Sequence, residues 1–294
     1  MIRRFSILLL ATMSLNSLNA QAQQRAIAFA GIENARDMGG LVMQDGRKIR
    51  PGMLVRSGNL SKATDADVTT LKERYHLTQV FDFRFEAEAA GAPDRVIDGV
   101  SYTHLSTLPK AFLAGFSSGR VDTAQIDSKN MLATLMKYAF APKAQAMAKQ
   151  LYPAIVADSL AQQYYGDFLR GILRAEGGAL WHCSQGKDRA GWASAFLLAA
   201  LGASRNVIVE DFDLSNQSYA PYVDALSAQV RDKEGGKEAE AFIRAMVGVS
   251  RENFETTLDQ IDQKYGSLAG YVEKELGFSK KEQKQLRKKY LIRD

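Results

Sequence analysis

The chain has 294 residues, a formal net charge of +5 and 46% hydrophobic residues. This length suffices for one large domain with a substantial core, and so mild a positive charge gives no argument for nucleic-acid binding. A single cysteine excludes an intramolecular disulfide, so the thiol is expected to be either buried or used in chemistry.

The first 22 residues have the pattern of a secretory signal peptide. Two arginines precede an apolar run over residues 7–13, and an Ala-Gln-Ala sequence that ends at Ala22 is a typical cleavage signal. The run is shorter than the about 20 apolar residues that cross a bilayer as a helix, and an uncleaved membrane anchor is the alternative. We therefore expect cleavage after Ala22, a periplasmic or secreted protein, and one domain over residues 23–294 with no membrane association beyond the signal peptide.

Apolar runs that are short enough for strands alternate with helical patterns along the mature chain. The candidate strands are Met53–Arg56, Gln79–Phe83, Val100–Leu105 and Ala179–His182. Thr64 is a candidate N-cap, and apolar residues at four-residue spacing predict helices over 158–175 and 254–265. This alternation is typical of an α/β fold with a central sheet.

The stretch over residues 106–151 interrupts the alternation. It mixes Gly, Ser and Ala with helical patches and lies between two predicted strands, so we expect an insertion that forms either a lid or surface decoration. At the other end of the chain, Ser279 and Glu282 form a capping box for a basic terminal helix. Its lysines and arginines are expected on a solvated face, and attraction to an anionic membrane surface is the weaker alternative.

The lone cysteine lies in the sequence His-Cys-Ser-Gln-Gly-Lys-Asp-Arg-Ala, residues 182–190, between a predicted strand and a nearly all-apolar helix over 189–201. Free backbone N–H groups at the start of a helix bind anions, and a glycine allows the tight turn that a phosphate-binding loop needs. Arg189 can hold two oxygens of an oxyanion at once. The predicted phosphate-binding residues are Ser184, Gln185, Gly186, Lys187, Asp188 and Ala190.

In this setting Cys183 is expected to be the nucleophile. The helix start and the nearby cations favour its thiolate, which would attack phosphorus to form a phosphocysteine that water then hydrolyses. The chemistry requires no metal or cofactor, and the sequence offers no metal-ligand cluster. The alternative is a buried cysteine with a purely structural role.

The leaving group needs a proton, and Asp82 is the first candidate for the catalytic acid because it ends a predicted strand. Asp188 is the second candidate, and Asp122 and Asp127 in the insertion are more distant ones. Alternatively, Asp82 is held by Arg84 without a catalytic role. His182 is expected to orient the loop around the cysteine. The charged residues near predicted strands that could frame the pocket are Arg36, Asp37, Arg56 and Arg84, although ordinary ion pairs account for each singly.

The sequence resembles the bacterial atypical protein tyrosine phosphatases of the mycobacterial protein tyrosine phosphatase B type. The H-C-x-x-G-K-D-R signature matches residues 182–189, and similar stretches are NARDMGG over 34–40, RSGNLSKATDADVTTL over 56–71, DFR over 82–84, and the helical stretches over 207–216 and 254–267. The resemblance implies a four- to five-stranded sheet with helices on both sides, a helical lid in some members, and hydrolysis of phosphotyrosine. A lysine in the loop accompanies dual specificity or phosphoinositide activity in related enzymes.

One position departs from the pattern of the superfamily, because Ala190 stands where many loops have Ser or Thr. In the superfamily, that hydroxyl is thought to stabilise the thiolate that leaves when the phosphocysteine is hydrolysed.

The leading hypothesis from the sequence is an exported cysteine phosphatase for phosphotyrosine proteins. The alternatives are a phosphatase for inositol phosphates, phospholipids or other small phosphoesters, and a phosphate-sensing or phosphoprotein-binding module with poor turnover. The oligomeric state does not follow from the sequence.

Overall fold

The computed structural model describes residues 25–109 and 138–293. The predicted signal peptide lies outside these residues, as do the two aspartates of the insertion and most of the proposed lid. The structure describes residues 106–109 and 138–151 of the insertion, and the second of these stretches leads into a helix, Pro142–Ala157, that contains the predicted helical patch over 144–151.

A five-stranded sheet forms the centre of the fold. Its strands are β1 (Arg36–Asp37), β3 (Leu54–Ser57), β4 (Leu77–Asp82), β5 (Ser101–His104) and β6 (Gly178–His182). Their order is β1-β3-β6-β4-β5, in which β1 is antiparallel to β3 and all other neighbours are parallel. The four predicted strands and the α/β fold class are confirmed. A second, two-stranded sheet joins β2 (Lys48–Ile49) to β7 (Leu291–Ile292).

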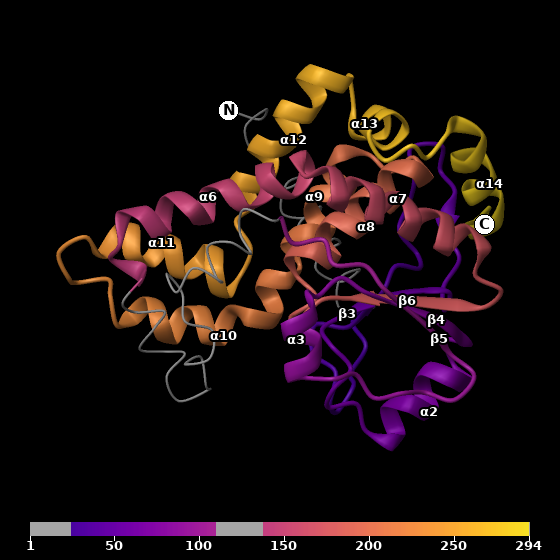
Figure 1. Cartoon of the computed structure of the whole chain (residues 1–294), viewed down its shortest axis with the longest axis horizontal. Helices are drawn as coiled ribbons and strands as arrows, with labels where there is room; N and C mark the ends of the chain where they lie inside the picture. The colour runs from indigo at the N-terminus through magenta and orange to yellow at the C-terminus, as the bar shows by residue number, and fades with distance from the viewer. Residues whose placement is uncertain (1–24, 110–137, 294) are drawn as a thin grey trace, which may run out of the picture.

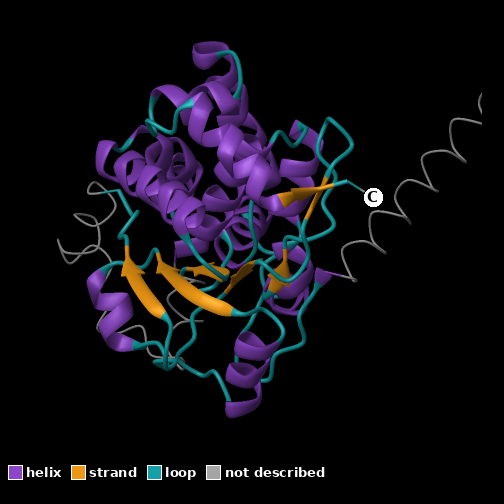
Figure 2. Cartoon of the chain, turned by 90° about the vertical axis from the view of Figure 1, so that its right-hand side faces the viewer, coloured by secondary structure: helices purple, strands orange, loops and turns teal. Residues whose placement is uncertain are grey.

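Helices cover both faces of the central sheet (Figure 2). They are α2 (Asp65–Glu73), α3 (Glu86–Gly91), α6 (Pro142–Ala157), α7 (Ser159–Arg174), α8 (Asp188–Leu201), α9 (Arg205–Asp213), α10 (Ser215–Ala228), α11 (Gly236–Val247), α12 (Arg251–Tyr265), α13 (Leu268–Lys274) and α14 (Lys280–Tyr290). The larger core joins one face of the sheet to α7, α8 and α12–α14, and a smaller core joins the other face to α2.

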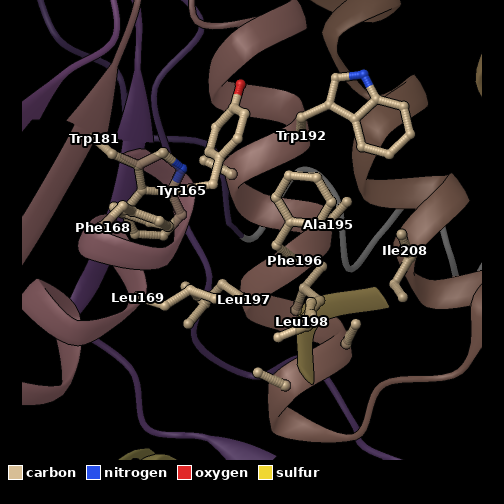
Figure 3. Close-up of a cluster of buried hydrophobic side chains, with 14 of the residues drawn as sticks. Tyr165, Phe168, Leu169, Trp181, Trp192, Ala195, Phe196, Leu197, Leu198 and Ile208 are labelled. Atoms are coloured by element: carbon tan, nitrogen blue, oxygen red, sulfur yellow. The ribbon is translucent and has the colours of Figure 1, made fainter. Parts of the chain in front are cut away.

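Helix α8 lies at the centre of the larger core. Every residue from Arg189 to Leu201 is buried, as the nearly all-apolar sequence predicts. Figure 3 shows its Trp192 and Phe196 among aromatic side chains from α7 and β6. The Phe196 ring lies 5.0 Å from that of Tyr165 in an edge-on arrangement, and Phe168 contacts Trp181 in the same way at 5.5 Å. This packing holds the start of α8 rigidly against the carboxyl end of β6.

Helices α6, α10 and α11 extend to one side of the sheet as an arm with its own small core (Figure 1). Buried residues of the arm core include Val230, Ala239, Phe242 and Ile243. The arm contacts the cysteine loop, because the Tyr152 hydroxyl of α6 donates to Asp188 and the Tyr219 hydroxyl of α10 donates to the Gln185 oxygen. Within residues 25–109 and 138–293, no helix has the length and apolarity that crossing a membrane requires.

The basic C-terminal helix α14 begins at the predicted capping box, but its charged face is not simply solvated. Arg287 donates from Nε to the carbonyl oxygen of Ala200 at 2.8 Å. Lys289 donates from Nζ to carbonyl oxygens at the end of α7, including that of Leu173 at 2.9 Å. These cations bind the carbonyl ends of α8 and α7, where unpaired carbonyls and the helix dipole favour positive charge. The expectation of a merely solvated face was therefore wrong for these two residues.

Candidate active site

Cys183 follows β6 directly, at the carboxyl edge of the sheet. Strand β6 is buried along its whole length and lies between β3 and β4, so the cysteine emerges between the ends of two neighbouring parallel strands. Open α/β sheets place their ligands at this edge. Five residues later α8 begins at Asp188, and the side chain of its N-cap, Lys187, makes no capping bond. The thiol is 2% exposed and therefore lies at the base of the loop.

The loop can close only because residue 186 is glycine. Gly186 has φ +68°, a left-handed conformation that side chains disfavour. A Cβ at this position would lie 2.1 Å from the backbone oxygen of Ser57 at the end of β3. Glycine thus provides both the turn and the close approach of the loop to the sheet.

The carbonyl groups of the loop turn outward and are held by side chains from other elements. Asn59 donates from Nδ2 to the Ser184 oxygen at 2.8 Å. The Gln185 oxygen accepts from Asn34 Nδ2 at 3.0 Å and from the Tyr219 hydroxyl at 2.8 Å. Because a peptide unit is planar and trans, a carbonyl that points outward directs the next N–H the opposite way.

Arg56 on β3 holds the next two carbonyls. Its Nη2 donates to the oxygens of Gly186 at 2.7 Å and Lys187 at 3.1 Å. Among the residues that the structure describes, no hydrogen bond occupies the backbone N–H groups from Ser184 to Arg189. The loop therefore presents a ring of N–H donors next to the thiol, which is the arrangement that binds a phosphate dianion.

The Arg189 guanidinium faces Glu88 of α3. Its Nη1 and Nη2 donate to the two Glu88 carboxylate oxygens at 2.5 and 2.8 Å, and the Ser184 hydroxyl donates to the same carboxylate at 2.5 Å. Burial favours a raised Glu88 pKa, but the bonds from Arg189 and Ser184 outweigh it and lower that pKa. Arg189 also interacts electrostatically with Cys183. Glu88 thus orients the guanidinium fork beside the thiol. Sequence reasoning missed it because an exposed Glu-Ala-Glu stretch carries no signal for this role.

Lys187 points away from the anion ring. Its Nζ donates to the carbonyl oxygens of Met246 and Gly248, the latter at 2.8 Å, and lies 3.7 Å from an Asp188 oxygen. Burial lowers the Lys187 pKa, an effect that the nearby Asp188 and Cys183 oppose. Its charge therefore acts on the site from a distance, while its main contact ties the loop to the C-terminal end of α11.

Asp82 lies at the end of β4 in a tight pair with Arg84. The guanidinium donates from Nε to both carboxylate oxygens, at 2.9 and 3.0 Å, and from Nη2 at 2.8 Å. Burial would raise the Asp82 pKa, but these bonds and the neighbouring His182 outweigh it and lower that pKa. In this arrangement the carboxyl group is ionised and its oxygens are occupied.

His182 joins this pair to a second carboxylate. Its Nε2 lies 3.0 Å from an Asp94 oxygen, and its Nδ1 lies 3.7 Å from Asp82 Oδ1. This cluster was not predicted from the sequence, and its two carboxylates and imidazole have the composition of a metal site. The Nη2 of Arg84, however, lies 2.8 Å from an Asp82 oxygen and 2.9 Å from an Asp94 oxygen, and so already supplies the positive charge between the two carboxylates. The cluster therefore fits a buried ion-pair network directly before the loop, and the orienting role of His182 stays a prediction.

Asp188, the other candidate acid, stands in the loop itself. Its Oδ1 accepts from the Tyr152 hydroxyl of α6 at 2.8 Å, and its side chain is 19% exposed. Burial raises the Tyr152 pKa, and the Asp188 carboxylate raises it further, so the phenol is a firm hydrogen-bond donor. Ala190 is fully buried behind the loop, and its carbonyl oxygen accepts from Ser194 and Trp181.

Known proteins resemble the chain over nearly the whole described part. A family model described as the tyrosine phosphatase family matches residues 27–292. A putative tyrosine-protein phosphatase of Cupriavidus necator is 31% identical over 256 residues, which is 84% of this chain and 82% of that protein. The triple specificity protein phosphatase PtpB of Mycobacterium tuberculosis is 30% identical over 271 residues, which is 82% of this chain and 91% of PtpB.

Proposed function

The chain belongs to the tyrosine phosphatase family and is a protein-tyrosine-phosphatase-like hydrolase, and from this premise we propose that it works through a phosphocysteine on Cys183. One observation carries the proposal. The buried thiol lies at the base of a loop whose carbonyls at residues 184–187 are bound by other side chains, which leaves the loop N–H groups, together with Arg189, as donors for a phosphate.

The proposed reaction has two steps. In the first, the Cys183 thiolate attacks phosphorus, the S–P bond forms and the P–O bond to the leaving group breaks, while a carboxylic acid protonates the leaving oxygen. In the second, water attacks phosphorus and gives a proton to the carboxylate left by the first step, while the S–P bond breaks and the thiolate returns. The loop N–H groups and Arg189 stabilise the equatorial oxygens in both transition states.

The contacts favour Asp188 over Asp82 as the proton donor, which reverses the preference drawn from the sequence. Asp82 would have to leave three hydrogen bonds from Arg84 and overcome a lowered pKa to carry a proton. Asp188 lies within the loop, is partly exposed, and bonds to a single phenol. We assign Asp82 the role of holding His182 and Arg84 behind the loop.

We further propose that the protein is exported and acts on phosphotyrosine in proteins. The signal-peptide pattern supports export, and the family supports the substrate class. Fractionation of cells that express the full chain tests export: the mature protein, shortened at Ala22, is expected in the periplasm or medium. Full-length protein retained in the cytoplasm would contradict it.

Activity on p-nitrophenyl phosphate tests the chemistry. The mature chain is expected to turn over steadily, and Cys183→Ser is expected to lose at least about 10⁴-fold in kcat because the thiolate nucleophile is absent. Retained turnover in a folded Cys183→Ser protein would contradict the phosphocysteine mechanism. A panel of phosphotyrosyl peptides, phosphoseryl peptides and inositol phosphates then tests the substrate. A strong preference for inositol phosphates would favour a small-phosphoester phosphatase instead.

A further inference from the structure

Three arginines and one aspartate are buried directly behind the cysteine loop. Asp211 of α9 is 1% exposed and accepts from Arg25 Nη1 at 3.0 Å, Arg36 Nε at 3.3 Å and Arg56 Nη1 at 2.9 Å. We propose that Arg56, held by Asp211, is a positioning residue that fixes the last two peptide groups of the loop and supplies the loop with positive charge. This inference rests on the proposed role of Cys183.

The two terminal nitrogens of Arg56 connect Asp211 to the cysteine loop. One nitrogen, Nη1, binds Asp211, while the other, Nη2, binds the Gly186 and Lys187 oxygens. Because each peptide unit is planar, holding these two carbonyls directs the N–H groups of Lys187 and Asp188 toward the opposite side, where the anion ring lies. Arg56 is fully buried, so water cannot substitute for it.

The packing of α8 accommodates this guanidinium closely. A Cβ at Gly191 would lie 3.3 Å from Arg56 Nη2 and 2.6 Å from the ring of Phe212. The glycine that follows the loop thus leaves room for the arginine behind it. On the strand side, Arg56 stands opposite Arg36 in the β1–β3 pair, an arrangement of like charges that is unfavourable unless an anion lies between them.

The charges of this cluster do not balance. Three guanidinium groups share the Asp211 carboxylate, and Asp37 of β1 interacts electrostatically with Arg25, which leaves one positive charge in excess. The other neighbouring titratable groups are the Tyr219 phenol, which interacts with Arg36, and the Cys183 thiol, which interacts with Arg56. Uncompensated buried cations are costly to a fold, and a thiolate or phosphate dianion in the loop would offset that cost. Burial and Arg36 lower the Arg56 pKa to about 9, which still leaves Arg56 charged at neutral pH.

The test compares variants by the pH dependence of Cys183 alkylation with iodoacetamide and by inhibition of turnover with inorganic phosphate. Arg56→Gln is expected to raise the midpoint of the alkylation profile by about one pH unit and to weaken phosphate inhibition about tenfold, because both the charge and the clamp are lost. Arg36→Gln leaves the loop contacts in place and is expected to raise the midpoint by a smaller amount. Arg205→Gln, on the far side of α9 and 40% exposed, is the control and is expected to change neither.

The outcomes separate this inference from the function on which it rests. If Arg56→Gln and Arg36→Gln are less stable to heat but keep the wild-type midpoint and phosphate inhibition, the cluster is only structural and the inference fails. If Arg56→Gln does not fold, the alkylation midpoint of Arg36→Gln decides: a raised midpoint supports the inference, and the wild-type midpoint shows that the cluster is only structural. If alkylation of Cys183 in the wild-type protein leaves turnover intact, the proposed function itself fails, whatever the variants show.

Discussion

At the scale of single residues, Glu88 determines where the Arg189 guanidinium lies. The carboxylate holds both Nη groups and also binds Ser184, so its removal would free the fork to rotate away from the thiol. We expect Glu88→Gln to lower kcat/KM about 10- to 100-fold with little change in fold, because small misplacements of a catalytic group are costly. The exposed neighbour Glu86→Gln is the matched control. Equal activity of the two variants would show that Arg189 is oriented without Glu88.

The two candidate acids differ in how their loss should depend on the leaving group. Without its general acid, the enzyme should lose about 10²–10⁴-fold on phenyl phosphate, whose leaving group needs a proton, and much less on p-nitrophenyl phosphate. We expect this pattern, with loss of the basic limb of the pH profile, for Asp188→Asn. Asp82→Asn should instead reduce stability and affect both substrates equally, since it breaks the pair with Arg84. The reverse pattern would restore Asp82 as the acid.

At the scale of elements, the strand–loop–helix unit from β6 to α8 depends on the backbone at Gly186. We expect Gly186→Ala to lower kcat/KM at least about 100-fold and to cost roughly 1–3 kcal/mol of stability, because both the left-handed φ and a contact with the Ser57 oxygen oppose a side chain. Gly46→Ala is a matched control, since its φ is +80° and nothing lies within 4 Å of the added Cβ. If Gly186→Ala and Gly46→Ala had comparable effects on stability, φ strain alone would account for the stability lost in Gly186→Ala.

Helix α14 stabilises the fold through charge at helix ends. Lys289 binds carbonyls at the end of α7, whereas its neighbour Lys288 is exposed. Lys289→Met should lower the free energy of unfolding by about 1 kcal/mol, and Lys288→Met should leave it unchanged within error. Urea unfolding measures both. No difference between them would mean that the Lys289 contacts add nothing net.

Two of the predicted strands have a simple physical reason for their signal. The inner parallel strands β3 and β6 are buried on both faces, so each appears as a short apolar run, whereas the predicted strand β5 lies at the edge of the sheet and is largely exposed. Strand β1 was not predicted because its two residues, Arg36 and Asp37, are charged and its existence depends on pairing with β3. Helices α10 and α11 were also not predicted, and they face a small core that they share with α6.

The residues of the site also differ in whether the local sequence or only the fold brings them together. Cys183 and Arg189 belong to one loop, so their spacing alone predicts their association. Glu88, Asp94 and Asp211 come from distant parts of the chain, and each is an ordinary carboxylate in its local sequence. Only the fold brings them to the loop, which is why the partners of the predicted residues could not be anticipated.

At the scale of the whole molecule, Asp211 couples the fold to pH. Burial would raise its pKa, but Arg36, Arg25 and Arg56 outweigh burial and lower that pKa far below the ordinary value. A lowered pKa contributes stability that is fully present above the unfolded value of about 3.9 and is lost as pH falls toward the folded pKa. Asp211→Asn should therefore cost about 3–5 kcal/mol at neutral pH, and the difference from wild type should shrink below about pH 4.

Urea unfolding of the two proteins at neutral and acidic pH measures this difference. The exposed Asp259→Asn, whose side chain is 63% exposed in an ion pair with Arg205, is the control and should show a small effect throughout. If the difference in unfolding free energy between wild type and Asp211→Asn widened in acid, the Asp211 pKa would not be lowered in the folded protein.

If the phosphoryl group is transferred through Cys183, rapid mixing with p-nitrophenyl phosphate followed by an acid quench should trap the phosphocysteine. We predict that mass spectrometry finds one phosphoryl group on Cys183 within the first turnover, that steady release of p-nitrophenol follows, and that Cys183→Ser carries no such group. A burst of about one equivalent followed by a stall would instead mark a phosphate sensor, as Ala190 would allow. Steady turnover with no phosphoryl group ever found on Cys183 would contradict the account.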